Sequence, residues 1–153
     1  MKISEYLKEE FCIMELKGKT KEEVIREIVN VLNKSGKIKT IDKFIKDILD
    51  RESLGSTGIG YNVAIPHART DSIEGFLIGF GKSINGVDFK SLDGEPVNFI
   101  FLIGTNPNDL NLYLRMLAEL SKFLMENSFR KMLTLANTPK DIINIFNTFE
   151  KHE

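Results

Sequence analysis

The sequence predicts an α/β fold in which one mixed β-sheet is flanked by helices on both faces. Its 153 residues, 42% of them apolar, are enough for one domain with a core of its own. Apolar residues recur at helical spacing in the first and last thirds of the chain and at extended spacing in the middle. No internal repeat, low-complexity tract or linker-like stretch divides the sequence, so we expect residues 1–153 to form a single domain.

The charge balance and the cysteine and histidine counts exclude several classes of function. With 21 Lys+Arg against 22 Asp+Glu, the formal net charge is -1, and the chain lacks the basic excess that nucleic-acid and anionic-membrane binders use. The lone Cys12 cannot form an internal disulfide, and two histidines are too few for a multi-cysteine zinc site. We therefore expect no nucleic-acid partner and no bound metal, and the cysteine usage favours the cytosol.

Neither a targeting segment nor a membrane span is expected. Charged residues follow Ser4, where a signal peptide would have an apolar run. The most apolar stretch, residues 99–103, is far shorter than the roughly 20 residues that a membrane-spanning helix needs. We therefore expect a cytoplasmic protein without direct membrane insertion.

The first third of the chain is predicted to form a short strand and two helices. Residues 11–16 mix apolar side chains with one charge, which is typical of a short strand. Thr20 and Glu23 have the spacing of a capping box, so a helix is expected to begin there. Thr40 is expected to cap a second helix, whose apolar period breaks at a glycine-rich loop, residues 51–60.

The middle and the last third are predicted to contain three strands followed by three helices. The turn formers at 106–109 precede a long helix with a leucine-rich face, and Ser128 is expected to cap the next helix. Thr138 is expected to cap the last helix, with Pro139 at its first position. The expected strands are residues 63–65, 76–80 and 97–103.

Residues 48–69 hold the side chains that are best suited to chemistry. Three glycines allow the backbone to approach a ligand closely, and Ser56 and Thr57 could donate hydroxyls to an anion. Arg51 and Arg69 could each present a planar fork of donors to a phosphoryl group. Turn formation by the glycines, and a surface salt bridge of Arg51 with Asp47, are the structural alternatives.

His67 is the candidate reactive group of this segment. Pro66 fixes its own φ and lacks an N–H, so the chain that enters His67 has restricted freedom and can aim the imidazole. A lone histidine near a strand end is otherwise often a structural hydrogen-bonding residue, and that alternative stays open on the local pattern alone.

Other motifs with known chemistry do not fit the segment. The nucleotide P-loop needs a lysine after its last glycine, and none follows Gly58 or Gly60. The dinucleotide-binding pattern also fails, because position 63 is valine, and no G-x-S-x-G elbow is present. A zinc site would have to recruit His152 from the charged tail, which makes a metal unexpected.

Two sequence blocks at their usual separation resemble a known family. The first contains Arg51-Glu52, the run Ser-Thr-Gly-Ile-Gly at 56–60, and Ala-Ile-Pro-His ending at His67. The second contains residues 87–97, followed by the apolar run 99–103. Together they resemble the enzyme IIA domain of the bacterial phosphoenolpyruvate-dependent phosphotransferase system, fructose/mannitol class, which includes nitrogen-related regulatory members. The resemblance covers nearly the whole chain and implies the same α/β fold.

This resemblance implies a phosphoryl carrier. His67 would take a phosphoryl group from the histidine-containing phosphocarrier protein and pass it to a IIB domain, with no cofactor, nucleotide or metal. Arg51 would stabilise the phosphoryl group, and Ser56, Thr57 and Arg69 would contribute to phosphate binding. A neutral imidazole near pH 7 is a competent nucleophile for this reaction.

Tyr113 marks a departure from the family pattern. Members of the family usually have a second histidine at the start of the long helix, and Tyr113 aligns with it here. The phenol could donate a hydrogen bond to the phosphoryl group, the chain could have shifted to another partner, or Tyr113 could merely pack.

Two functions therefore stay open. The first is a carrier in coupled sugar uptake. The alternative is a regulatory protein whose partner binding depends on phosphorylation of His67, because a phosphoryl group adds about -1.5 to -2 charges at the surface.

Overall fold

The central feature of the fold is a six-stranded mixed sheet. The computed structural model describes residues 2–151, and its strands follow the order β1-β5-β6-β3-β2, with β4 also paired to β6. β5 and β6 pair antiparallel, whereas β1 pairs parallel with β5, and β3 and β4 pair parallel with β6. The strands are β1 (Cys12–Ile13), β2 (Gly58–Gly60), β3 (Val63–Ala64), β4 (His67–Arg69), β5 (Phe76–Val87) and β6 (Val97–Thr105).

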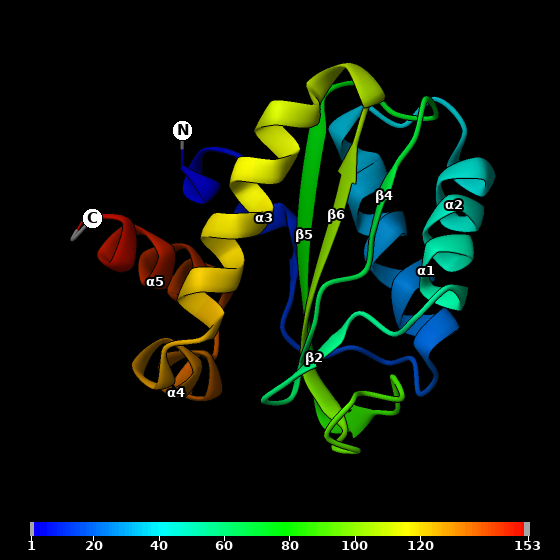
Figure 1. Cartoon of the computed structure of the whole chain (residues 1–153). Helices are drawn as coiled ribbons and strands as arrows, with labels where there is room; N and C mark the ends of the chain where they lie inside the picture. The colour runs from blue at the N-terminus through cyan, green and yellow to red at the C-terminus, as the bar shows by residue number, and fades with distance from the viewer. Residues whose placement is uncertain (1, 152–153) are drawn as a thin grey trace.

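Helices cover both faces of this sheet, as the sequence predicts. Figure 1 shows α1 and α2 on one side and α3, α4 and α5 on the other. Short 3-10 turns at Ile3–Glu5, Glu9–Phe11, Asn33–Ser35 and Pro107–Asp109 join these elements. The helices are α1 (Lys21–Leu32), α2 (Ile41–Ser53), α3 (Leu110–Leu124), α4 (Asn127–Leu135) and α5 (Pro139–Lys151).

The two helix layers pack on the sheet in different ways. On one face, glycines in the strands let the helices approach closely: a Cβ on Gly79 would lie 2.9 Å from Ile28 of α1, and one on Gly104 would lie 2.4 Å from Phe44 of α2. On the other face, aromatic side chains fill the core, and the Phe101 and Phe146 rings meet edge to face at 5.8 Å. The close packing of α2 against β4 and β6 is what brings α2 next to the candidate site.

Most of the helices begin where the sequence predicts, and one begins elsewhere. The capping box is confirmed, because Glu23 N–H donates to Thr20 Oγ1 at 3.2 Å and Thr20 N–H donates to Glu23 Oε1 at 3.1 Å. Thr40 does precede α2, but its side chain makes no capping hydrogen bond. The prediction of Ser128 as a cap was wrong: α4 already begins at Asn127, since the tight turn after α3 leaves Glu126 at the N-cap position.

The strands differ from the sequence prediction mainly in the glycine segment. Part of the expected loop forms β2, which pairs with β3 in a hairpin whose two turn residues, Tyr61 and Asn62, have φ of 56° and 65°. Positive φ at both positions is the geometry of a two-residue hairpin turn that matches the strand twist. β4 was also missed, because three residues are too few to show a period. The strand expected at 11–16 is reduced to Cys12–Ile13.

Candidate functional site

His67 is held at the start of β4 by hydrogen bonds of the sheet. β4 runs parallel to β6, with His67 opposite Ile103, and Ile103 N–H donates to the Pro66 carbonyl at 3.0 Å. Because Pro66 contributes a carbonyl to the ladder and needs no donor partner, it fits directly before the strand. The backbone that carries the imidazole is thereby anchored to a central strand.

The local backbone also sets the tautomer of His67. Its Nδ1 lies 2.8 Å from the carbonyl oxygen of Ile65, and a carbonyl can only accept, so Nδ1 carries the hydrogen. In the neutral ring, the lone pair is therefore on Nε2. Burial lowers the pKa of His67 below its ordinary value, and the Arg51 charge acts in the same direction, although the Ile65 carbonyl and Glu52 oppose it. The ring is neutral near pH 7 and has a free nucleophilic nitrogen.

A cavity of about 320 Å³ lies beside this ring. It collects side chains from α2, β4 and α3, three elements that are far apart in the sequence. Four of the predicted site residues, Arg51, His67, Arg69 and Tyr113, are brought together here, and Asp47 joins them unpredicted. The lining residues are Asp47, Arg51, His67, Ala68, Arg69 and Tyr113.

Arg51 lies in the last turn of α2 and presents its guanidinium to the cavity. Its Nη1 donates to the Gly55 carbonyl at 3.0 Å, which steadies the side chain and leaves other N–H groups for a ligand. Within residues 2–151, the alternative ion pair with Asp47 is not formed, since Asp47 pairs with Lys43 instead. The Arg51 guanidinium is therefore not engaged in a salt bridge with Asp47.

Tyr113 both packs in the core and lines the cavity. It is 6% exposed, and its ring centroid lies 5.9 Å from that of His67 at an interplanar angle of 44°. Burial raises the pKa of the phenol, although Arg51 and Arg69 act against this, so the hydroxyl is neutral at pH 7. No residue in the described part of the chain forms a hydrogen bond with this hydroxyl, which leaves it free to donate to a ligand.

Ser56 and Thr57 lie outside the residues that line the cavity. The Ser56 hydroxyl donates to the Phe89 carbonyl at 2.5 Å, and the Thr57 hydroxyl donates to the Glu52 carboxylate. Both hydroxyl hydrogens are therefore used to shape the glycine segment. Phosphate binding by these two residues stays a prediction, and it would require them to exchange these partners.

Glu52 is a structural residue of the site to which the sequence analysis gave no role. It is buried, and its carboxylate accepts from Thr57 N–H at 2.8 Å and from Lys21 Nζ at 3.2 Å. This arrangement ties the end of α2 to the glycine segment and to the start of α1. The sequence did contain a signal for the burial of Glu52, because this residue follows Ile48 by four positions and so lies on the apolar face of α2.

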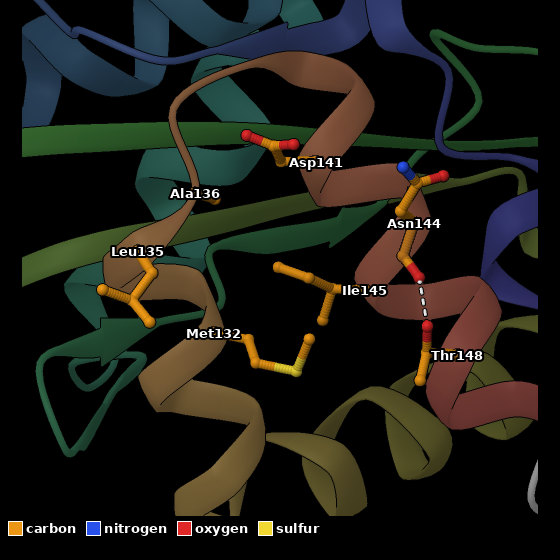
Figure 2. Close-up of a pocket in the computed structure, with 7 residues that line it drawn as sticks. All are labelled: Met132, Leu135, Ala136, Asp141, Asn144, Ile145 and Thr148. Carbon is orange, nitrogen blue, oxygen red and sulfur yellow. Dashed lines mark hydrogen bonds between the residues drawn. The ribbon is translucent and has the colours of Figure 1, made fainter.

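A second cavity, of about 290 Å³, lies on α4 and α5 (Figure 2). Its walls are apolar at Met132 and Ile145, and the polar Thr148 hydroxyl is already donating to the Asn144 carbonyl at 2.9 Å. It contains none of the predicted site residues.

In the described range, no group of three or more His, Cys, Asp or Glu side chains could hold a metal ion, and no helix is long and apolar enough to cross a membrane.

Comparison with known proteins decides the family. The profile described as "Phosphoenolpyruvate-dependent sugar phosphotransferase system, EIIA 2" matches residues 5–149, nearly the full chain. The chain belongs to this EIIA family. This is the family that the two sequence blocks predict.

Curated relatives agree with this assignment. The chain is 42% identical over 151 residues to the PTS system fructose-specific EIIABC component of Bacillus subtilis. The aligned region covers 99% of this chain but 24% of that protein. It thus spans about a quarter of that longer relative. A fructose-specific EIIA component from Haloferax volcanii is 29% identical over 82% of both chains.

Solved structures share the fold. The nitrogen regulatory protein IIA-Ntr of Neisseria meningitidis superposes with a TM-score of 0.87, at 26% identity, over 94% of this chain and 98% of that chain. Enzyme IIA of the mannitol system from Escherichia coli, in a complex with phosphorylated enzyme IIB, gives a TM-score of 0.78 at 22% identity, over 93% of this chain and 99% of that chain. The predicted α/β architecture of an EIIA protein is confirmed.

Proposed function

We propose that residues 1–153 act as an EIIA phosphoryl carrier and that His67 is the phosphorylated residue. The observation that carries this proposal is the tautomer of His67: Nδ1 is bound to the Ile65 carbonyl, so the lone pair of the neutral ring is on Nε2. His67 also lines a cavity with the two guanidinium groups of Arg51 and Arg69. A nucleophile beside two cationic groups is what transfer of an anionic phosphoryl group requires.

The transfer step follows from this geometry. The Nε2 lone pair attacks the phosphorus of a phosphohistidine on the donor protein, and an N–P bond forms while the donor N–P bond breaks. The electron pair of the broken bond returns to the donor ring, which leaves as neutral imidazole if its other nitrogen was protonated. His67 becomes a phosphoimidazolium that keeps its Nδ1 hydrogen on the Ile65 carbonyl. Passage to an acceptor reverses these roles.

Three side chains have distinct tasks in this proposal. Arg51 and Arg69 offset the charge that spreads over the phosphoryl oxygens in the loose transition state. Tyr113 donates one neutral hydrogen bond in place of the second histidine that is usual in the family. None of these steps calls for a nucleotide or a metal.

The partners are proposed from the family and from the named relatives. A histidine-containing phosphocarrier protein would be the donor, and a IIB domain the acceptor, as the solved mannitol complex pairs IIA with phosphorylated IIB. Because two relatives are named fructose-specific, a fructose pathway is the first one to test. Both exchanges would take place in the cytoplasm.

A regulatory role is the second candidate. A nitrogen regulatory protein of Bradyrhizobium diazoefficiens is 32% identical over 98 residues, 64% of both chains, and the Neisseria IIA-Ntr fold superposes closely. In this role, the charge added at His67 would decide which protein binds. Both candidates require the same phosphorylated residue.

Reconstitution of the relay tests the proposal. The chain is incubated with phosphoenolpyruvate, enzyme I and the phosphocarrier protein, and the mass of the intact protein is measured. We expect the mass to increase by one phosphoryl group, through an acid-labile and base-stable adduct that His67→Ala abolishes and His152→Ala preserves. His152 lies outside the described residues. Phosphate retained by the His67→Ala protein would refute the assignment.

The two candidate roles are separated by the acceptor. A sugar carrier should deliver its phosphoryl group to a fructose-type IIB domain with kinetics that account for uptake. A regulatory protein should keep its phosphoryl group in the presence of that domain.

A further inference from the structure

The cavity beside His67 contains an acidic residue, which is unexpected in a site for an anionic group. Among the described residues that line the cavity, Asp47 is the one carboxylate. Its Oδ2 accepts from Lys43 Nζ at 2.8 Å and from the Thr70 hydroxyl at 2.6 Å. Its Oδ1 accepts no hydrogen bond from any residue in the range 2–151, and the side chain is 24% exposed. One oxygen is thus held by the protein, and the other is free.

This carboxylate is ionised at neutral pH. Burial alone would raise the pKa of Asp47, but the hydrogen bonds from Lys43 and Thr70 outweigh it and hold the pKa below its ordinary value. Lys43 does not neutralise Asp47 fully, because its ammonium is shared with Asp71 at 3.1 Å. The wall of the cavity therefore includes a carboxylate whose charge Lys43 offsets only in part.

We propose that Asp47 sets how readily the phosphoryl group leaves His67. The inference rests on the proposed phosphorylation of His67. In the unphosphorylated protein, Asp47 lines the same cavity as Arg51 and Arg69 without an ion pair to either among the described residues. Once the phosphoryl group adds about -1.5 to -2 charges to the same cavity, Asp47 repels it.

The consequence is a shorter-lived phosphorylated state. Two arginines without an opposing charge would hold the phosphoryl group tightly, and a carrier that binds its cargo too tightly transfers it slowly. Asp47 opposes part of their attraction, so the transfer equilibrium shifts away from His67 and toward a partner protein. Lys43 sets the size of this effect, because it screens Asp47.

Asp47→Asn tests the inference, with Asp50→Asn as the matched control. Both substitutions remove one negative charge from α2, and asparagine keeps an oxygen for the Thr70 hydroxyl. Asp50 is 61% exposed, pairs with Lys46 at 2.6 Å and does not line the cavity. In the reconstituted relay, we measure the equilibrium phosphorylated fraction against the phosphocarrier protein and the half-life of isolated phosphoprotein.

We expect Asp47→Asn to raise both the transfer equilibrium constant and the half-life by about three- to tenfold. Asp50→Asn should leave both near the parent values. In about 1 M salt, where the Debye length falls to about 3 Å, the difference between the two variants should shrink. A purely structural role of Asp47 would change the melting temperature and would not produce this salt dependence.

Lys43→Met is an independent test, in which the half-life should change in the opposite direction. It removes the ammonium group that offsets the charge of Asp47, so it should shorten the half-life of the phosphoprotein. In the Asp47→Asn background, it should have no further effect. Equal half-lives for the parent, Asp47→Asn and Asp50→Asn proteins would overturn the inference while leaving phosphorylation of His67 intact. A parent chain that accepts no phosphoryl group would instead overturn the proposed function itself.

Discussion

Nδ1 of His67 lies 2.8 Å from the carbonyl oxygen of Ile65, two positions earlier in the chain. Because Pro66 separates these residues, the bond closes a short and stiff segment that fixes both the direction of the ring and its tautomer. It leaves Nε2 as the nucleophile. It also stabilises a phosphoimidazolium, whose Nδ1 hydrogen keeps the same acceptor.

The first prediction concerns pH. Burial lowers the pKa of His67 below the ordinary 6.5, and only the neutral ring is a nucleophile. Phosphoryl uptake should therefore rise with pH through a midpoint below 6.5 and stay constant above it. Titration of the His67 ring by NMR, in parallel with the rate of uptake, measures both midpoints. A midpoint above 6.5 would contradict the burial argument.

The second prediction concerns Arg51. Lysine keeps the charge but loses the planar fork, so Arg51→Lys should slow transfer by about tenfold with little change in melting temperature. Arg26→Lys is the matched control, because Arg26 pairs with Glu22 on the exposed surface of α1. A normal transfer rate with a large loss of stability would show that Arg51 only anchors the Gly55 carbonyl.

The third prediction concerns Tyr113. Its hydroxyl is free to donate one hydrogen bond, so Tyr113→Phe should slow transfer or shorten the phospho-His67 lifetime by about fivefold, or about 1 kcal/mol. Tyr113→His should instead introduce a pH dependence between about 6 and 7.5, where an imidazole titrates. Tyr61→Phe, at the exposed tip of the β2–β3 hairpin, controls for loss of a phenol. If Tyr113→Phe behaves as the parent, the residue only packs.

The fourth prediction concerns the buried carboxylate of Glu52. Glu52→Gln leaves Lys21 and the Thr57 donors without a charged acceptor, and we expect it to lower the free energy of unfolding by about 2 kcal/mol. The same change should lower the pKa of His67 further, since Glu52 raises it in the native protein. Urea denaturation and NMR titration report the two effects. Glu22→Gln, an exposed glutamate of α1, should change neither, and an unaltered His67 midpoint in Glu52→Gln would refute the electrostatic link.

The sequence by itself determined the features that depend on neighbouring residues. Thr20 and Glu23 satisfy each other's backbone N–H groups within four positions, so the start of α1 could be predicted from spacing alone. The apolar run within β6 and the direction of the His67 ring after Pro66 likewise depend on residues that are close together in the sequence. The fold class followed because the period of apolar residues reports on which side of each element is buried.

The tertiary structure alone decided the composition of the cavity. Phe44 packs over Gly104, which places α2 against β4 and brings Asp47 and Arg51 to His67, while α3 supplies Tyr113 from the opposite helix layer. The hydroxyls of Ser56 and Thr57 looked available in the sequence, yet they donate to other parts of the chain. Contacts between elements that are distant in sequence depend on how side chains fill the space between them, and no local spacing or periodicity encodes that packing.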